Sequence, residues 1–519
     1  MSGTAELSPP PAAVADDAAL DAPPPPEPLA TSEPSVALEL RLHPDDAAKL
    51  ARLPEITALA TGRLRPAALE LIWHDTPDAA LAGLGLSLCE ARLGGQRACR
   101  LEQLRAWPGL QPALASEATA LAELADALPT PLAPMAALHG QGRAFRLAPD
   151  APIGAVELWT GTLRTVAAER PVARLRLRGT PDAVFDLALT LAASLRIGVA
   201  AVSLAAEALA LAQPHGRSRP PSPPTLEAGL SVSEAFSRLA GQLTAVLLHH
   251  APAAAAGAAP EPVHQMRVAL RRLRSAMSLF SRATGCAELD AAKTQLKPLA
   301  AALGPARDWD VFTAGTGRAV AAAFEDDVAV ARLLSAAERR RVASYRTLRE
   351  TLESPDFRVL ALTLVRLAVT RPWERALDAD PRRAELLDAD LRHYAAHALS
   401  RRLRHARMAG EDPAAMSLSD LHALRIQCKR LRYAAEFFAP LFPGRDTRRF
   451  VHGLGVLQER LGHLNDGAVA GGLMASLGGS GGRAFAAGVV RGFVAAQTQD
   501  VRAKAERSWR KFQHIKTFW

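Results

Sequence analysis

Two kinds of periodicity divide the chain. In "VALELRL" at 36–42 and "VARLRLRG" at 172–179, apolar and polar residues alternate, which predicts strands with one buried face. After about residue 225 this alternation nearly disappears, and apolar residues recur every three or four positions, as in amphipathic helices. The pattern predicts an α+β multidomain chain, with a β-rich unit first and an all-α helical bundle second.

Proline-rich stretches mark the boundaries of these units. Residues 1–34 include "DAPPPPEP" and few bulky apolar residues, so we expect this Pro/Ala-rich tail to be disordered. "QPHGRSRPPSPP" is typical of a linker, which we place at 213–227. The 519-residue chain is long enough for the two units that remain, at 35–212 and 228–515.

Charge is distributed unevenly between the two halves. Residues 1–225 contain 19 lysines and arginines against 24 aspartates and glutamates, a net charge of −5. Residues 226–519 contain 43 against 29, a net charge of +14. A strongly basic half is expected to meet a polyanion or an acidic surface, although charge alone does not say which.

The sequence contains no evident targeting or redox signal. Its cysteines, Cys89, Cys99, Cys286 and Cys428, form no Cys-x-x-Cys pair and require no oxidising compartment. The N-terminus lacks the basic start and apolar core of a signal peptide, and no uncharged apolar stretch is long enough to span a bilayer. We therefore expect a soluble, cytoplasmic protein that binds no metal and no cofactor.

A sequence motif occurs twice in the basic half. "HQMRVALRRLR" at 264–274 and "HALRIQCKRLR" at 422–432 align on their histidines at an offset of 158 residues. "LGPARDWDV" at 303–311 and "LGHLNDGAV" at 461–469 share that offset. Two separated motifs with one offset indicate an internal duplication, which predicts two helical halves packed about a pseudo-twofold axis.

Each copy of the motif has an apolar face. The apolar positions alternate in spacing between four and three residues, so they share one side of a helix. Core packing is the ordinary role of such a stripe, and its methionines require no cofactor. The residues are Met266, Leu270, Leu273, Met277 and Phe280 in the first copy, and Leu424, Cys428, Leu431, Ala435 and Phe438 in the second.

A basic face lies beside the apolar one. His264, Arg267, Arg271 and Arg274 repeat the three-four-three spacing, rotated by roughly 100° from the apolar stripe. Neither eleven-residue motif contains an acid, so Arg267 and Arg271 repel each other across one turn unless an anion, or an acid elsewhere in the fold, pairs with them. Arginine suits phosphate oxygens, and two such stripes fit a long multivalent polyanion better than a single phosphate.

Together the two motifs resemble the CHAD (conserved histidine α-helical domain) family across 228–515. The resemblance implies a helical bundle of two pseudo-symmetric halves that binds inorganic polyphosphate and can bring proteins to polyphosphate granules. For Arg307 the alternative is a structural role with Asp308, as an ion pair or a helix cap. The polyphosphate contacts that we infer are His264, Arg267, Arg271, Arg272, Arg274, Lys293, Lys297, Arg307, His422, Arg425, Lys429, Arg430 and Arg432.

Residues 35–212 resemble the CYTH, or triphosphate-tunnel, family, an antiparallel β-barrel that hydrolyses triphosphates with a divalent metal. "VALELRL" stands where that family has its Glu-x-Glu-x-Lys strand, but only Glu39 remains of the two acids. Arg174 and Arg176 replace acids on a late strand, and Leu204 and Glu207 stand where the closing motif has Lys and Arg. Because a tunnel enzyme needs carboxylates for its metal, we expect a degenerate barrel without catalysis.

Two other functions remain open at this point. A divergent metal-dependent triphosphatase would need replacement ligands that the sequence does not offer. A nucleic-acid-binding protein would also use basic helices, but there is no helix-turn-helix pattern and the chain has three tyrosines for base stacking. We expect no specific nucleic-acid partner and no membrane partner, because the bundle core needs the apolar helix faces; granule proteins are further candidate partners.

Overall fold

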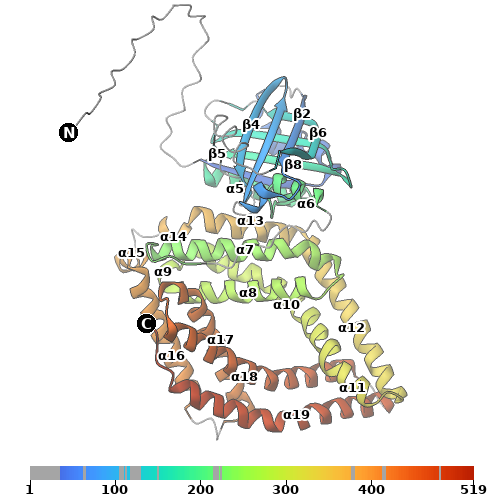
Figure 1. The fold of residues 1–519 in the computed structure, drawn as a ribbon, viewed down its shortest axis with the longest axis vertical. Helices are drawn as coiled ribbons and strands as arrows, with labels where there is room; N and C mark the ends of the chain where they lie inside the picture. The colour runs from blue at the N-terminus through green and yellow to red at the C-terminus, as the bar shows by residue number, and fades with distance from the viewer. Residues whose placement is uncertain are drawn as a thin grey trace, which may run out of the picture. The chain divides into compact units, whose positions relative to one another are not determined.

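The computed structural model describes residues 35–61, 66–104, 110, 114–116, 130–145, 147–148, 151–213, 221, 225–375, 380–411, 416–478 and 481–519. The tail expected to be disordered, at 1–34, lies outside these residues, as does most of the expected linker at 213–227. Between Ser35 and Trp519 the chain forms one compact unit, in which a β-sheet region is followed by helices (Figure 1).

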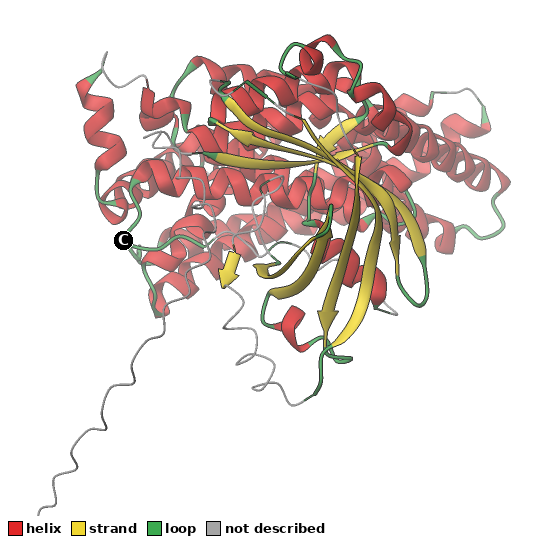
Figure 2. Ribbon diagram, turned by 90° about the horizontal axis from the view of Figure 1, so that it is seen from above, coloured by secondary structure: helices red, strands yellow, loops and turns green. Residues whose placement is uncertain are grey.

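All the paired strands of the N-terminal region run antiparallel, as the sequence predicts. The strand order is β5-β4-β3-β2-β6-β7-β8-β1-β9, so the described sheet has two ends and is not a closed barrel. A single bridge between Leu38 and Leu110 nevertheless connects β1 to the segment before β5, and Figure 2 shows the twist of the strands. The strands are β1 (Val36–Leu42), β2 (Pro66–Asp75), β3 (Leu86–Leu93), β4 (Gln96–Gln103), β5 (Leu114–Ser116), β6 (Ala133–Phe145), β7 (Ile153–Arg164), β8 (Glu169–Gly179) and β9 (Ile197–Val199).

A helix covers each face of this sheet. Helix α5 (Pro181–Ser194) packs Phe185 and Leu191 against one face, which presents alternate apolar residues of β1 and β8. Helix α6 (Leu204–Ala212) packs against the other face, over Trp73 and Trp159. Short helical turns connect the strands: η1 (Pro44–Asp46), α1 (Ala47–Leu50), α2 (Pro54–Thr57) and α3 (Ala80–Gly83).

The helical region contains the same succession of elements twice. Helices α7, α8, α9, α10 and α12 are followed, after a connecting segment, by α16, α17, η3, α18 and α19. Their bounds are α7 (Val232–Ala256), α8 (Glu261–Leu279), α9 (Ser281–Thr284), α10 (Ala287–Phe312), η2 (Thr313–Gly317), α11 (Arg318–Ala323), α12 (Val328–Glu353), α13 (Pro355–Thr370), α14 (Pro372–Arg375), α15 (Pro381–Asp388), α16 (Leu391–Ala409), α17 (Leu418–Phe438), η3 (Ala439–Leu441), α18 (Arg445–Leu477) and α19 (Gly482–Gln513).

The two halves are related by pseudo-symmetry, as the repeat predicts. Helix α10 begins at Ala287 and α18 at Arg445, which are 158 residues apart, the offset of the sequence motifs. Ser231 and Asp390, the N-cap residues of α7 and α16, form a β-bridge with each other, as equivalent positions do near a twofold axis. Helix α8 contacts its counterpart α17, and α12 contacts α19.

These contacts close a ring of helices. Helix α8 contacts α17, α17 contacts α18, α18 contacts α19, α19 contacts α12, α12 contacts α10, and α10 returns to α8. Figure 1 shows α8 facing α17 and α18 across the interior of this ring. A separate apolar cluster that includes Trp309, Leu333, Met474 and Val490 joins α10 and α12 to α18 and α19. The basic motifs therefore lie on two helices of this ring, α8 and α17, that contact each other.

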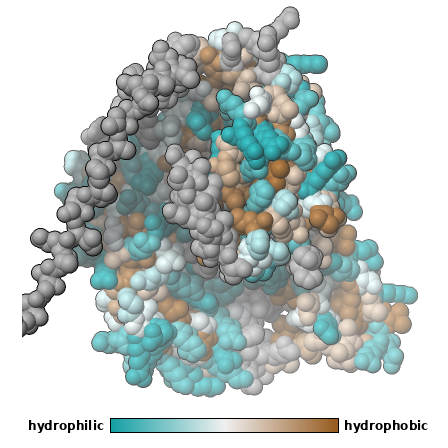
Figure 3. Space-filling model, turned by 45° about the horizontal axis from the view of Figure 1, so that its top comes forward, coloured by the Kyte–Doolittle hydropathy of each residue, from teal (hydrophilic) through white to brown (hydrophobic). Residues whose placement is uncertain are grey.

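The sheet region and the bundle share a hydrophobic core. Residues of α5 and of α13 belong to the same buried cluster, which continues into α7 and α8. At the edge of this contact Arg366 on α13 binds Asp182 at 3.0 Å and Asp186 at 2.7 Å, both on α5. No described helix is both long and apolar enough to cross a membrane, and in Figure 3 hydrophobic residues are scattered among hydrophilic ones.

Candidate anion-binding site

The two motif helices form as their periodicity predicts. The apolar stripe of α8 is buried, including Met266, Leu273 and Phe280, and so is the stripe of α17, including Cys428 and Leu431. The ten stripe residues named from the sequence are all less than 9% exposed. Because this stripe holds each helix against the core, the adjacent basic face is turned toward the interior of the ring.

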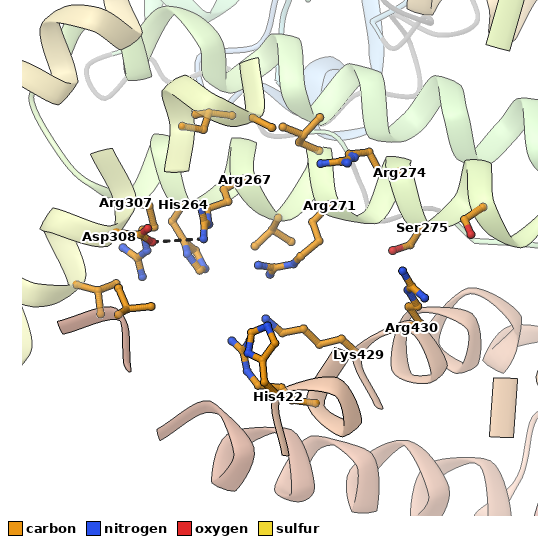
Figure 4. A pocket seen from close by; sticks show the side chains of 18 of the residues that line it. His264, Arg267, Arg271, Arg274, Ser275, Arg307, Asp308, His422, Lys429 and Arg430 are labelled. Atoms are coloured by element: carbon orange, nitrogen blue, oxygen red, sulfur yellow. Dashed lines mark ion pairs between the residues drawn. The ribbon is translucent and has the colours of Figure 1, made fainter. Parts of the chain in front are cut away.

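A large cavity lies between α8, α10 and α17. It has a volume of about 1070 Å³, and the side chains of the two motif helices point into it from opposite sides in Figure 4. Ten lysines and arginines and two histidines line it among the described residues. Eleven are predicted from the sequence: His264, Arg267, Arg271, Arg274, Lys293, Lys297, Arg307, His422, Arg425, Lys429 and Arg430.

Asp308 is the single carboxylate among the described residues that line the cavity. Its Oδ1 lies 3.3 Å from Nη2 of Arg267, and Figure 4 draws this pair as a dashed line. Asp308 lies inside α10, four residues before its last residue, Phe312, and is not a cap residue of that helix. Of the two structural alternatives, an ion pair or a helix cap, Asp308 forms the ion pair, and its partner is Arg267. Burial lowers the pKa of Arg267, and the positive charges of Arg271 and Arg307 act in the same direction.

Several cavity cations have no acidic partner within the part of the chain that the structure describes. Among the described residues no carboxylate lies within ion-pair distance of Arg274, Lys297, Arg307 or Arg430. Lys293 also lines the cavity, although its Nζ binds Asp290 at 2.8 Å. Like charges held around one hollow focus a positive potential in it, so a bound polyanion would relieve their mutual repulsion.

Arg271 connects the two halves of the bundle. Its Nε donates a hydrogen bond to the hydroxyl oxygen of Tyr433 on α17, and its guanidinium carbon lies 5.7 Å from the centre of that ring. Because Tyr433 is itself buried and therefore fixed, its hydroxyl and ring hold the guanidinium of Arg271 in one position. The sequence predicts Arg271 as a contact but gives no indication of this support.

Arg272 and Arg432 are predicted contacts that do not line the cavity. Both bind Glu436 on α17: Arg272 at 3.7 Å and Arg432 through Nε at 2.6 Å. Arg272 also lies over the ring of Phe437, at 5.2 Å from its centre. These two arginines therefore pair with an acid outside the eleven-residue motifs, which was the alternative to pairing with a bound anion.

Arg402 is a cavity residue that the sequence reasoning missed. It lies on α16, is only 9% exposed, and donates a hydrogen bond to the Ser278 hydroxyl at 3.1 Å. Among the described residues no carboxylate pairs with it. The run "RRLRHAR" at 401–407 contains no acid, and this was the signal that could have identified a third basic helix.

His264 lies at the end of the cavity near Arg307 (Figure 4). Burial lowers the pKa of His264, and Arg307 lowers it further, while Glu261 acts in the opposite direction. The imidazole is therefore a neutral hydrogen-bonding group at neutral pH, and a bound anion would favour its protonation.

The N-terminal sheet has a buried charge network that joins β1, β8 and α6. Glu39 on β1 lies opposite Arg176 on β8 and binds Arg176 at 2.8 Å and Arg174 at 3.4 Å. Glu207 on α6 binds Arg174 and Arg170. Arg174 is therefore shared by two carboxylates, Glu39 and Glu207, and the charges of this network neutralise one another.

Helix α6 fills the space over this network. Leu204, Ala205, Ala208 and Leu209 pack into the apolar cluster of this sheet face. The cavity left beside Glu39 and Arg176 has a volume of about 30 Å³, which is room for about one water molecule. Within the described ranges no group of three or more His, Cys, Asp and Glu side chains could hold a metal ion.

Comparisons with known proteins give the following relatives. Residues 238–475 match the CHAD domain. The CHAD domain from the plant Ricinus communis is 30% identical, over 58% of this chain and 97% of that one, with a TM-score of 0.49. PptA from Streptomyces chartreusis is 16% identical, over 54% and 100%, with a TM-score of 0.40. A Hippeastrum adenylyl cyclase described as having a dominant triphosphatase activity is 12% identical, over 30% and 83%, with a TM-score of 0.22. No curated protein matches the chain.

The matched residues reach from α7 to α18 and contain both copies of the histidine–arginine motif. They also contain the described side chains that line the large cavity. The Ricinus communis domain is covered over nearly its whole length at 30% identity. The chain therefore belongs to the CHAD domain family.

Proposed function

We propose that this protein binds inorganic polyphosphate in the cavity between α8, α10 and α17, without hydrolysing it. The observation that carries the proposal is the excess of positive charge: ten lysines and arginines and two histidines surround the cavity with one described carboxylate. Holding so many cations around one hollow is unfavourable unless an anion occupies it.

A linear polyanion fits this arrangement better than a compact one. The basic series of α8 extends from His264 to Arg274, which is about 15 Å at 1.5 Å per residue, and α17 contributes a second series on the opposite side. A single phosphate could contact one or two of these guanidinium groups. A chain of phosphates could contact both helices and the lysines of α10 together.

The N-terminal sheet supports a non-catalytic function. Its carboxylate Glu39 is paired with two arginines, and α6 occupies the space beside it. A divalent metal would need several oxygen ligands there and would be repelled by Arg174 and Arg176. We further propose that polyphosphate binding places the protein on cytoplasmic polyphosphate granules, where granule proteins are its candidate partners.

A competition experiment with the full chain tests the proposal. Labelled long-chain polyphosphate is bound at fixed salt, and unlabelled long-chain polyphosphate, triphosphate and double-stranded DNA compete for it. We expect long-chain polyphosphate to compete best and DNA, matched for phosphate concentration, to compete much more weakly. Equal or stronger competition by DNA would favour a nucleic-acid-binding protein, and release of phosphate from triphosphate with Mg²⁺ would favour an enzyme.

A further inference from the structure

Positive charge continues out of the cavity at one end. The cavity lining includes Ser281 and Arg402, and the next residue in the chain beside each, Arg282 on α9 and Arg401 on α16, is also basic. Arg404 follows Arg401 by three residues and so lies on the same side of α16. These three arginines, Arg282, Arg401 and Arg404, are called the exit arginines below.

Helix α16 is fixed against the end of α8, which sets the positions of the exit arginines. The hydroxyl of Tyr394 donates to the Leu279 carbonyl at 3.1 Å, and its ring stacks on Phe280 at 5.3 Å between centres. Arg401 lies seven residues after Tyr394, two turns along the same helix face. Arg282 lies two residues after Phe280, so it comes close to Arg401.

The exit arginines act on one another as neighbouring positive charges. Burial lowers the pKa of Arg401, and the positive charges of Arg282 and Arg404 lower it further. Burial likewise lowers the pKa of Arg402, followed by the charges of Arg401 and Arg430. Arg430 lines the cavity, so one unbroken series of cations leads from its interior to the surface. Within the described chain no carboxylate pairs with any member of this series.

Arg402 lies between Arg430 in the cavity and Arg401, and its side chain is the most buried of this series. Nη2 of Arg402 donates to the Ser278 hydroxyl, and because this side chain lines the cavity, its other donors are open to acceptors that a ligand brings. Phosphate oxygens passing from Arg430 to Arg401 would supply them. The opposite end of the cavity is different, because Glu261 lies near His264 there and disfavours an anion.

We infer that a polyphosphate chain leaves the cavity between α9 and α16 and continues along Arg282, Arg401 and Arg404, so that the protein selects long chains over short ones. This inference rests on the proposed function. A triphosphate can occupy the cavity without reaching the exit arginines. A long chain makes both sets of contacts, and the second set adds affinity because its phosphates are already held nearby.

The test compares two chain lengths in the full protein. Arg401→Gln/Arg404→Gln is titrated with triphosphate and with long-chain polyphosphate at fixed salt. The matched control is Arg339→Gln/Arg340→Gln, which removes the same charge from two exposed positions on α12. We expect the exit variant to bind the long chain roughly five- to tenfold more weakly and triphosphate as the wild type does, with the control unchanged for both.

Arg282→Gln removes the exit arginine that lies on α9, and it should likewise weaken the binding of long-chain polyphosphate but not of triphosphate. Melting temperatures of all variants should stay close to that of the wild type, because Arg282 and Arg404 are exposed and Arg401 is only partly buried. An equal loss for both chain lengths, or no loss for either, would overturn the exit path while polyphosphate binding by the wild type stands. Failure of the wild type to bind either ligand would instead overturn the proposed function, and this inference with it.

Discussion

Arg267 Nη2 and Asp308 Oδ1 lie 3.3 Å apart, so the one described carboxylate of the cavity is bonded to an arginine of the first repeated motif. Both side chains are about one-third exposed, so the pair contributes little to stability. Its main effect is electrostatic, because it cancels one positive charge where the polyanion is proposed to bind.

Asp308→Asn should therefore raise the affinity for polyphosphate several-fold, since it removes a repulsive charge and releases Arg267 for the ligand. The dissociation constant at low salt is the measurement, with Glu350→Gln on the exposed face of α12 as a control of equal charge change. Weaker binding by Asp308→Asn would mean that Asp308 positions Arg267, and the repulsive role assigned here would be wrong.

Arg274 and Lys297 offer the clearest test of the cavity cations, because both are exposed and neither has a described acidic partner. Arg274→Gln/Lys297→Gln should weaken binding at least about tenfold. It should also flatten the dependence of log K on log salt by about 0.7 for each cation removed, as established for single-stranded nucleic acids. The melting temperature of the free protein should not change; unchanged affinity and salt slope would remove these two residues from the site.

Polyphosphate affinity should rise as the pH falls, because protonation of His264 adds a cation to the cavity. Burial lowers the pKa of His264 in the free protein, whereas a bound anion favours protonation, so the rise should continue as the pH falls below the ordinary histidine value of about 6.5. Affinity measured against pH for the wild type and for His264→Gln gives the comparison. A pH dependence of the same size in the variant would assign the effect to another group.

The same lowered pKa predicts the stability of the free protein. The folded form binds this proton less readily than the unfolded chain, so the unfolding free energy should decrease as the pH falls below about 6.5. Burial also lowers the pKa values of His249 and His250, so these two residues should likewise reduce the unfolding free energy as the pH falls. Bound polyphosphate should oppose the loss, which a thermal melt with and without ligand would detect.

The buried network of the sheet should be structural. Glu39→Gln leaves Arg174 and Arg176 without their shared carboxylate and should lower the unfolding free energy by about 3–5 kcal/mol. Glu169→Gln, which breaks the exposed pair with Arg164 at 3.3 Å, should cost about 0–1 kcal/mol. Neither the wild type nor the variants should release phosphate from triphosphate with Mg²⁺ or Mn²⁺; metal-dependent turnover that disappears with Glu39 would contradict this account.

The sequence carries much of the fold because its periodicities are regular. The motif helices, their buried stripes and the pseudo-symmetric halves all follow from spacing and a shared offset of 158 residues. The sequence does not show which arginines and lysines form ion pairs with acids that are distant in the chain. Glu436 lies four residues beyond Arg432, yet its contact with Arg272 depends on how α8 crosses α17.

Two further features required tertiary structure. Arg402 belongs to a helix outside the repeated motifs, and only the packing of α16 against α8 brings it into the cavity. The sequence also predicts two units, but it does not show that α5 of the first and α13 of the second contribute to one continuous core. Helix α13 contacts both α5 and α7, and its buried residues include three in succession, Leu360, Ala361 and Leu362, so periodicity alone does not assign one partner to each face.

A crystal structure of the full chain with long-chain polyphosphate would test the central claim most directly. We predict continuous phosphate density in the cavity, in contact with Arg271 of α8, Lys429 of α17 and Lys297 of α10. Density confined to another surface of the protein, with this cavity holding only solvent, would contradict it.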